Sequence, residues 1–92
     1  MSVIEIRQAT VNDSCLILRF ITELAAYEKA ENEVIATQQD IECSLFGSDS
    51  TTFAVICSVN NEPVGFAVYF FNYSTWLGKR GLHLEDLYVS PQ

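Results

Sequence analysis

The chain has 92 residues and a mass of 10.3 kDa, which suits one small domain or one part of a larger one. Its 49% hydrophobic and 18% charged residues exclude a disordered chain. Twelve acidic residues against five basic ones give a net charge of −7, which argues against binding to nucleic acid or to an anionic membrane and suits a cationic small molecule.

The sequence contains no recognisable sorting signal or metal motif. No apolar run approaches the ~18 residues that cross a bilayer, and no basic segment followed by an apolar core forms a signal peptide. Cys15, Cys43 and Cys57 are widely spaced and form no C-x-x-C pair, which disfavours a disulfide framework and a zinc site. We therefore expect a cytoplasmic protein without a metal and without membrane contacts.

The first elements predicted are a strand and a helix. Residues 3–7 alternate weakly between apolar and polar side chains and favour a short strand. Thr10 offers a helix N-cap with Asp13 three residues later. Apolar residues then recur at three- and four-residue spacing, so we expect a helix that ends near Tyr27 and Glu28.

A second helix is expected after an acidic loop over residues 28–36. Thr37 is its N-cap, again with an aspartate three residues later (Asp40), and Gly47 ends it. Seven acidic residues lie between residues 23 and 49, and the simplest interpretation of this cluster is a solvated surface.

The second half of the chain has the composition and period of strands. Residues 52–59 and 64–73 predict two strands, and the turn chemistry at 60–63 joins them in a hairpin. A loop over 74–81 and a final strand over 82–89 complete the order β-α-α-β-β-β.

The final predicted strand is apolar although it ends three residues before the chain does. Such strands are typical of the interior of a sheet, with neighbours beside them and a helix above. We therefore expect either that the chain is truncated or that a second copy covers this strand.

Five short segments carry a likeness to a known family. Each is weak by itself, but five in this order and spacing are specific. The segments are Ile6-Arg7-Gln8-Ala9-Thr10, Glu23-Leu24-Ala25-Ala26-Tyr27-Glu28, Val64-Gly65-Phe66-Ala67-Val68-Tyr69-Phe70-Phe71, Trp76-Leu77-Gly78-Lys79 and Leu84-Glu85-Asp86-Leu87-Tyr88-Val89. Together they resemble the N-terminal half of the GNAT N-acetyltransferase superfamily, and most of all the diamine (spermidine/spermine-type) acetyltransferases. The resemblance implies an α+β, GNAT-like N-terminal half with a mostly antiparallel sheet and two helices, as a single partial domain over residues 1–92.

The resemblance also implies a cosubstrate, acetyl-CoA. In such enzymes a R/Q-x-x-G-x-G/A turn follows the fourth strand and binds the acetyl-CoA pyrophosphate at a helix N-terminus. The sequence stops at Ser90-Pro91-Gln92, before that turn, and the tyrosine that resembles the general acid belongs to the later half. We therefore expect the chain by itself to bind acetyl-CoA weakly.

Acetyl transfer to an amine requires a group that removes the amine proton. A polyamine nitrogen has a pKa near that of lysine, about 10.4, so it arrives charged, and a carboxylate attracts it and accepts its proton. Glu85 and Asp86 are the candidates. In a regular strand they point to opposite faces, so at most one meets the amine unless a bulge re-aims the strand. Without the likeness, both are better explained as ordinary acids of a strand.

By resemblance, Glu85 takes or relays the amine proton, and Asp86 lies near the substrate. The backbone of Leu87, Tyr88 and Val89 matches the segment that pairs with the pantetheine arm of the cofactor and polarises the thioester carbonyl. We expect the side chains of Leu87 and Val89 to be ordinary core residues.

Tyr27, Glu28 and Trp76 match positions that line the acceptor channel in diamine-type enzymes. The alternative is that Tyr27 covers the core at the end of a helix and that Glu28 is a surface residue. Trp76 lies in a predicted loop, where its ring could stack on a cationic amine. Ser74-Thr75 precedes it, where the diamine-type enzymes often have Asp-Pro, and this departure weakens the case for a polyamine.

Two functions remain open at the level of the sequence. The first is an N-acetyltransferase acting on a small (poly)amine, completed by a C-terminal half in cis or in trans. The second is a non-catalytic half-fold that forms a homodimer through its exposed C-terminal strand and acts as a binding or structural module.

Overall fold

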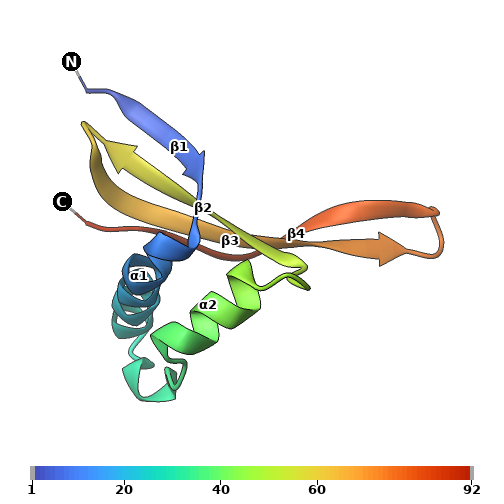
Figure 1. The fold of residues 1–92 in the computed structure, drawn as a ribbon, viewed down its shortest axis with the longest axis horizontal. Helices are drawn as coiled ribbons and strands as arrows, with labels where there is room; N and C mark the ends of the chain where they lie inside the picture. The colour runs from blue at the N-terminus through green and yellow to red at the C-terminus, as the bar shows by residue number, and fades with distance from the viewer. Residues whose placement is uncertain (1, 92) are drawn as a thin grey trace.

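A computed structural model describes residues 2–91 (Figure 1). The secondary structure comprises strands and helices in the predicted order. They are β1 (Ile4–Gln8), α1 (Ser14–Tyr27), α2 (Gln38–Phe46), β2 (Thr52–Val59), β3 (Glu62–Ser74) and β4 (Lys79–Val89), with short 3-10 turns at Val11–Asp13 and Glu31–Glu33. No helix among residues 2–91 combines the length and the apolar content needed to cross a membrane.

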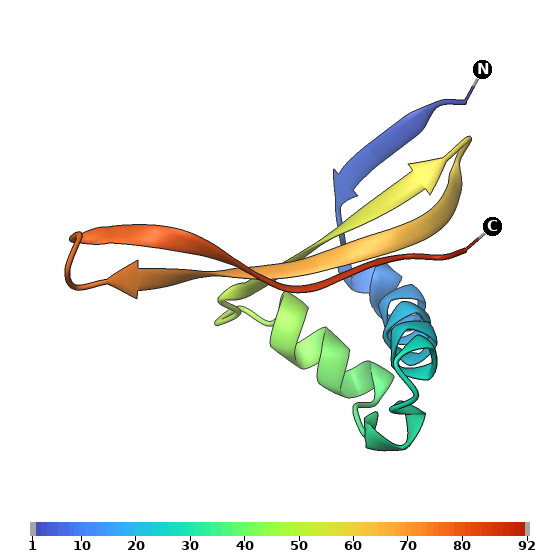
Figure 2. The ribbon, with the colours of Figure 1, turned by 180° about the vertical axis from the view of Figure 1, so that it is seen from behind.

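The four strands form one antiparallel sheet in the order β1-β2-β3-β4, so each strand pairs with its neighbour in the chain. Both helices lie on the same side of this sheet (Figures 1 and 2). No described element covers the opposite side, which we call the bare face. The predicted α+β class and the antiparallel sheet are confirmed.

The second helix begins where the sequence predicted, whereas a 3-10 turn follows the predicted cap Thr10 and α1 itself begins at Ser14. Thr37 Oγ accepts a hydrogen bond from the Asp40 amide (3.1 Å), and Asp40 Oδ2 accepts one from the Thr37 amide (2.9 Å), which completes a capping box. At the first helix, Asp13 Oδ2 accepts from the Thr10 amide (2.8 Å), and both Asp13 oxygens also accept from the Arg7 guanidinium (2.8 and 2.9 Å). A 3-10 turn therefore precedes α1, and Arg7 joins this turn to β1.

The β2–β3 hairpin has a tighter turn than the sequence suggested. Asn60 and Asn61 have positive φ angles of 52° and 69°, and Val59 already pairs with Glu62. Asparagine tolerates this left-handed conformation, which two-residue hairpin loops require. Glu62 and Pro63, predicted as part of the turn, are therefore the first residues of β3.

The loop prediction over 74–81 was too long. Only residues 75–78 form the turn, and β4 begins at Lys79, with Lys79 paired to Ser74 and Arg80 to Tyr73. Polar residues and glycines suggested a loop. The backbone pairing between β3 and β4 nevertheless continues through this exposed region, although no core packs against it. The β3–β4 hairpin consequently extends well beyond the helices (Figures 1 and 2).

The core lies between the helices and one face of the sheet. The rings of Phe20 in α1 and Phe66 in β3 stack with their centroids 5.7 Å apart. The buried cluster consists of Ile17, Phe20, Ile41, Leu45, Ala54, Ile56, Phe66, Val68 and Tyr88. The prediction that Leu87 and Val89 are core residues was wrong, because their side chains lie on the bare face and are 62% and 60% exposed.

Candidate functional site

The end of β4 is shaped by a β-bulge at Glu85. Val68 pairs with Asp86, and the next residue of β3, Tyr69, pairs with Leu84, so Glu85 is an extra residue on β4. One extra residue reverses the alternation of side chains along a strand. The regular geometry that would place Glu85 and Asp86 on opposite faces therefore does not hold here.

The bulge decides which side chains of β4 reach the bare face. Leu84 and Leu87 lie opposite Tyr69 and Ala67, which alternate along β3 with the core residue Val68. They share one face although three positions separate them. The exposed apolar side chains of β4 are consequently Leu82, Leu84, Leu87 and Val89.

A groove of about 260 Å³ separates the last turn of α1 from the end of β4. It brings together four of the residues singled out in the sequence, which come from opposite ends of the chain. The lining residues are Leu24, Tyr27, Leu87, Tyr88, Val89 and Pro91. Most of these side chains are apolar, so polar specificity has to come from the rim.

The charges of two carboxylates act on a third, Asp86, next in sequence to the groove residue Leu87. Burial raises the pKa of Asp86 above its ordinary value, and the negative charges of Glu85 and Glu28 raise this pKa further. Asp86 is half-buried and Glu85 is exposed. A cationic amine bound here would relieve the repulsion among the acids, and Asp86 holds a proton more readily than an ordinary aspartate does.

The backbone of Leu87 and Val89 faces an open edge of the sheet. β4 is the last strand in the described sheet, and the Ser90 amide donates to the Val64 carbonyl at 2.7 Å. Antiparallel strands alternate between hydrogen-bonded and non-bonded positions, so the N–H and C=O groups of Leu87 and Val89 point away from β3. An extended amide-bearing chain such as pantetheine fits these groups, since it can pair with them as an added strand would.

The side chain of Tyr88 is part of the core, and it contacts two residues of α1. Its ring lies 6.1 Å from that of Phe20, and its hydroxyl donates to Glu23 Oε1 at 3.0 Å. Burial raises the pKa of the Tyr88 phenol, and the hydrogen bond to Glu23 raises it further. No role was predicted for Glu23 from the sequence, although its spacing from Phe20 and Tyr27 places it on the same helix face.

Trp76 is not brought to the groove. It lies in the turn 75–78 at the far end of the β3–β4 hairpin and is 96% exposed. His83 lies on the same hairpin, where its ring packs on Phe70 with centroids 4.7 Å apart.

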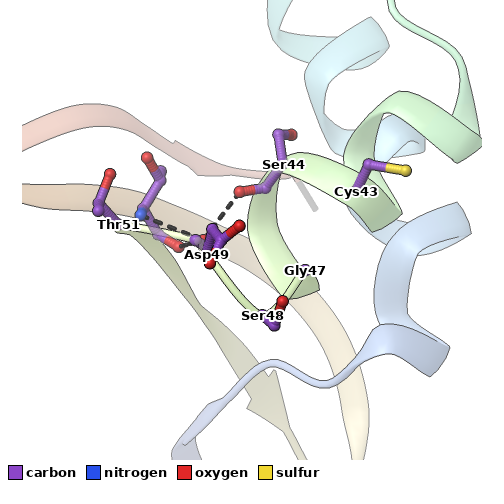
Figure 3. Close-up of a pocket in the computed structure, with 8 residues that line it drawn as sticks. Cys43, Ser44, Gly47, Ser48, Asp49 and Thr51 are labelled. Carbon is purple, nitrogen blue, oxygen red and sulfur yellow. Dashed lines mark hydrogen bonds between the residues drawn. The ribbon is translucent and has the colours of Figure 1, made fainter.

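A second hollow, of about 390 Å³, lies where α2 runs into the loop before β2 (Figure 3). The Ser50 hydroxyl closes this loop by donating to the carbonyls of Ser44 and Thr52, both at 2.8 Å. The hollow is lined mainly by polar residues and includes none of the site residues predicted from the sequence. It therefore adds nothing to the candidate site.

Comparison with known proteins places this geometry in a family. The model of the acetyltransferase (GNAT) family matches residues 16–92. The chain belongs to the GNAT acetyltransferase family. GNAT acetyltransferases use acetyl-CoA, which agrees with the open edge of β4 described above.

Curated relatives of this GNAT chain include a thialysine acetyltransferase and a protein named for its likeness to a spermidine/spermine acetyltransferase. A thialysine N-epsilon-acetyltransferase from Bos taurus is 35% identical over 100 residues, which cover 100% of this chain and 58% of the relative. The spermidine/spermine N(1)-acetyltransferase-like protein 1 of Homo sapiens is 38% identical over 97 residues, covering 98% of this chain and 14% of the relative. The chain thus spans little more than half the length of the thialysine enzyme.

Solved structures confirm the GNAT-like fold. A possible acetyltransferase from Clostridium difficile 630 superposes with a TM-score of 0.74 at 22% identity, covering 96% of this chain and 58% of the other. A ribosomal-protein-alanine N-acetyltransferase from Brucella melitensis biovar Abortus 2308 gives a TM-score of 0.71 at 17% identity, with 96% and 57% covered.

Proposed function

We propose that this GNAT chain forms the acceptor side of an acetyl-CoA-dependent N-acetyltransferase that acts on a small, cationic amine. The observation that carries the proposal is the groove between α1 and β4, where an open strand edge lies beside Asp86, a carboxylate on which the charges of Glu85 and Glu28 act. The names of the curated relatives support the same substrate class, since thialysine and spermidine are both amines.

Each part of the groove has a role in this proposal. Tyr27 and Glu28 line the part of the site that binds the amine, and Asp86 attracts the positive charge of the amine. Glu85 accepts the amine proton, directly or through a water, so that the nitrogen lone pair becomes available. The backbone of Leu87, Tyr88 and Val89 orients the cofactor, and an N–H group there polarises the carbonyl that the nitrogen attacks. Acetyl-CoA supplies the acetyl group as a thioester.

Trp76 enters this proposal only at a distance from the groove. Its exposed ring at the tip of a long hairpin suits contact with the amine only if another part of the protein, or a second copy, brings it there. We therefore propose that Trp76 contacts the substrate only when another part of the protein or a second copy brings it to the groove.

We further propose that full activity needs protein beyond this chain. The chain spans 58% of the thialysine enzyme, and its sequence contains no Gly-rich phosphate loop. A C-terminal half, in cis or in trans, supplies that loop and the general acid for the leaving thiolate. The free thiols of Cys15, Cys43 and Cys57 support the cytoplasm as its compartment.

Titration calorimetry and an acetylation assay test these statements together. The 92-residue chain is compared with a protein extended over the remaining length of the thialysine enzymes, using acetyl-CoA, spermidine and thialysine. We expect weak acetyl-CoA binding by the chain, and tight binding with amine acetylation by the extended protein. Tight binding by the chain alone would contradict the need for a second half, and an extended protein that acetylates no amine would contradict the proposed activity.

Within the extended protein, Glu85→Gln and Asp86→Asn separate the two acids. Loss of the proton acceptor in Glu85→Gln lowers kcat about 10²-fold or more, whereas Asp86→Asn raises the KM for the amine. An exposed acid outside the groove, changed as Asp49→Asn, is the matched control and leaves both constants unchanged. Unaltered kcat in Glu85→Gln would exclude Glu85 as the base.

The second candidate function is self-association through β4. It is favoured by a specific observation, since β4 is an edge strand and its leucines on the bare face are exposed. A homodimer of this kind is compatible with the acetyltransferase. Sedimentation at micromolar concentration tests it: a dimer supports the candidate, and a monomer counts against it.

A further inference from the structure

Glu23 connects α1 to the end of β4 by two hydrogen bonds and makes a third polar contact within α1. Its Oε1 accepts hydrogen bonds from the Tyr88 hydroxyl at 3.0 Å and the Ser90 hydroxyl at 3.3 Å. Its Oε2 lies 3.4 Å from Nε of Arg19, one turn earlier in the helix. One carboxylate thus holds Tyr88 in β4 and Ser90 just after it.

The position of Glu23 explains how it reaches the strand without entering the groove. Phe20, three residues before Glu23, packs on the Tyr88 ring. Leu24 and Tyr27, one and four residues after Glu23, line the groove. Tyr88 and Ser90 are two residues apart and therefore approach α1 from the same face of β4. The neighbours Leu87 and Val89 lie on the bare face.

The strand end is held from its other side by β3. The Ser90 amide donates to the Val64 carbonyl at 2.7 Å, so Ser90 contacts both β3 and Glu23. Gly65 allows this close approach, because a Cβ there would collide with the Tyr88 carbonyl. The backbone of residues 88–90 is therefore clamped between β3 and one helix side chain.

We propose that Glu23 is a positioning residue, which fixes the end of β4 against α1 and so sets the direction of the Leu87 and Val89 backbone groups toward the cofactor. It touches neither the amine nor the cofactor in this scheme, and the catalytic part of the inference rests on the proposed function. Loss of its carboxylate releases Tyr88 and Ser90 from α1, and the open edge that binds pantetheine is no longer held in one orientation.

A purely structural role predicts a different pattern of effects. The Glu23 side chain is 35% exposed and its partner Arg19 is 59% exposed, so this ion pair contributes little to global stability. A positioning role instead predicts local release of the strand end and weaker cofactor binding, with little change in the affinity for the amine.

Two measurements on the 92-residue chain test, without reference to activity, whether Glu23 clamps residues 88–90 against α1. We expect hydrogen exchange at the Ser90 amide to become about tenfold faster in Glu23→Ala, as expected for the loss of a hydrogen bond to a charged group. In Glu23→Gln, which keeps an acceptor oxygen but no charge, we expect the pKa of Tyr88, followed by the NMR signal of its ring, to fall toward its ordinary value. Glu33→Gln, an exposed acid of the turn Glu31–Glu33, is the matched control.

Kinetics on the extended protein test the consequence for catalysis. We expect Glu23→Ala to raise the KM for acetyl-CoA about tenfold while the KM for the amine stays within about twofold, and Glu23→Gln to recover most of the loss. Unchanged exchange and titration in the variants would overturn the clamp. A clamp that is lost without any effect on the KM for acetyl-CoA would overturn the positioning role.

Failure of the proposed function gives a different result. If the wild-type extended protein acetylates no amine but its calorimetric affinity for acetyl-CoA falls in Glu23→Ala, the positioning inference stands and the proposed reaction does not. If that affinity is the same in both, the positioning inference is overturned as well.

Discussion

The Asp86 carboxylate lies where its charge is disfavoured. Burial raises its pKa, and the charges of Glu85 and Glu28 add to the effect. The folded protein therefore retains a proton on Asp86 at a pH where the unfolded chain has lost it. Stability from this group is complete at low pH and is lost as the pH rises through the folded-state pKa.

Asp86→Asn should accordingly stabilise the chain at neutral pH. The amide carries no charge to be desolvated or repelled, so we expect a higher Tm than wild type at neutral pH and a gap that closes as Asp86 becomes protonated at acidic pH. Thermal denaturation followed by circular dichroism across this range measures it, with Asp49→Asn as control. A gap that does not depend on pH would contradict the assignment.

Asp13 shows the opposite effect. The hydrogen bonds from Arg7 outweigh the effect of burial and lower the pKa of Asp13, and the Thr10 amide lowers it further. Its contribution to stability is present above the pKa of an unfolded aspartate and is lost as the pH falls through the lowered native value.

Asp13→Asn should therefore destabilise the chain at neutral pH, by about 1–2 kcal/mol, through loss of a charged cap and of the bidentate Arg7 pair. The loss should shrink at strongly acidic pH, where the wild-type carboxylate is also protonated. Urea unfolding at neutral and acidic pH measures both values, and an equal loss at the two would rule out the ionised pair as the cause.

At the scale of the elements, β3 and the end of β4 approach each other closely at Gly65. A Cβ at Gly65 would collide with the Tyr88 carbonyl and lie 3.1 Å from the Val89 Cα. Gly81, further along the same hairpin, is blocked only by the Asn72 side chain, whose Oδ1 would lie 2.6 Å from an added Cβ. The obstacle at Gly65 is backbone and is fixed, whereas the Asn72 side chain at Gly81 can rotate away.

Gly65→Ala should therefore cost about 1–3 kcal/mol, a typical cost of overpacking, whereas Gly81→Ala should cost much less. Hydrogen exchange at Ser90 should also accelerate in the first variant only, because the Tyr88–Ser90 segment has to move away from β3. Denaturant unfolding of both variants provides the comparison, and equal losses would show that the approach of β4 is not the constraint.

The elements also show where local sequence was sufficient. The two Thr-x-x-Asp caps, strand β2 and the turning point at Asn60 follow from interactions within a few residues, and all were predicted. The bulge at Glu85 was named only as a condition, because it depends on the pairing register of β4 with β3. Pairing register is set by the whole sheet, not by the strand's own sequence.

For the whole molecule, the two faces of the sheet differ. One face packs on both helices, while the other exposes apolar side chains from β1 to β4, among them Ile4, Ile6, Leu84 and Leu87. A net charge of −7 opposes the association of two such chains. Salt screens this repulsion and leaves the apolar attraction in place.

Self-association of the 92-residue chain should therefore strengthen from low to high salt. Leu84→Lys, which puts a charge on the bare face outside the groove, should weaken it, whereas Thr22→Ala on the exposed side of α1 should not. Sedimentation velocity at several salt concentrations measures these effects. Association that is insensitive to Leu84→Lys would exclude the bare face as the contact.

The amino-acid sequence alone was enough to establish the succession of elements, the start of α2 and the β2–β3 hairpin, because caps, turns and periodicity act over a few residues. Its resemblance to the GNAT superfamily implied the family and the antiparallel sheet. The folded chain was needed to show that Tyr27 meets Leu87–Val89 in one groove, that Trp76 lies apart from it, and that Glu23 holds the end of β4. Leu87 and Val89 show the reason. Their apolar character predicted burial, but burial depends on what lies against a face, and that is decided by contacts between residues far apart in the chain.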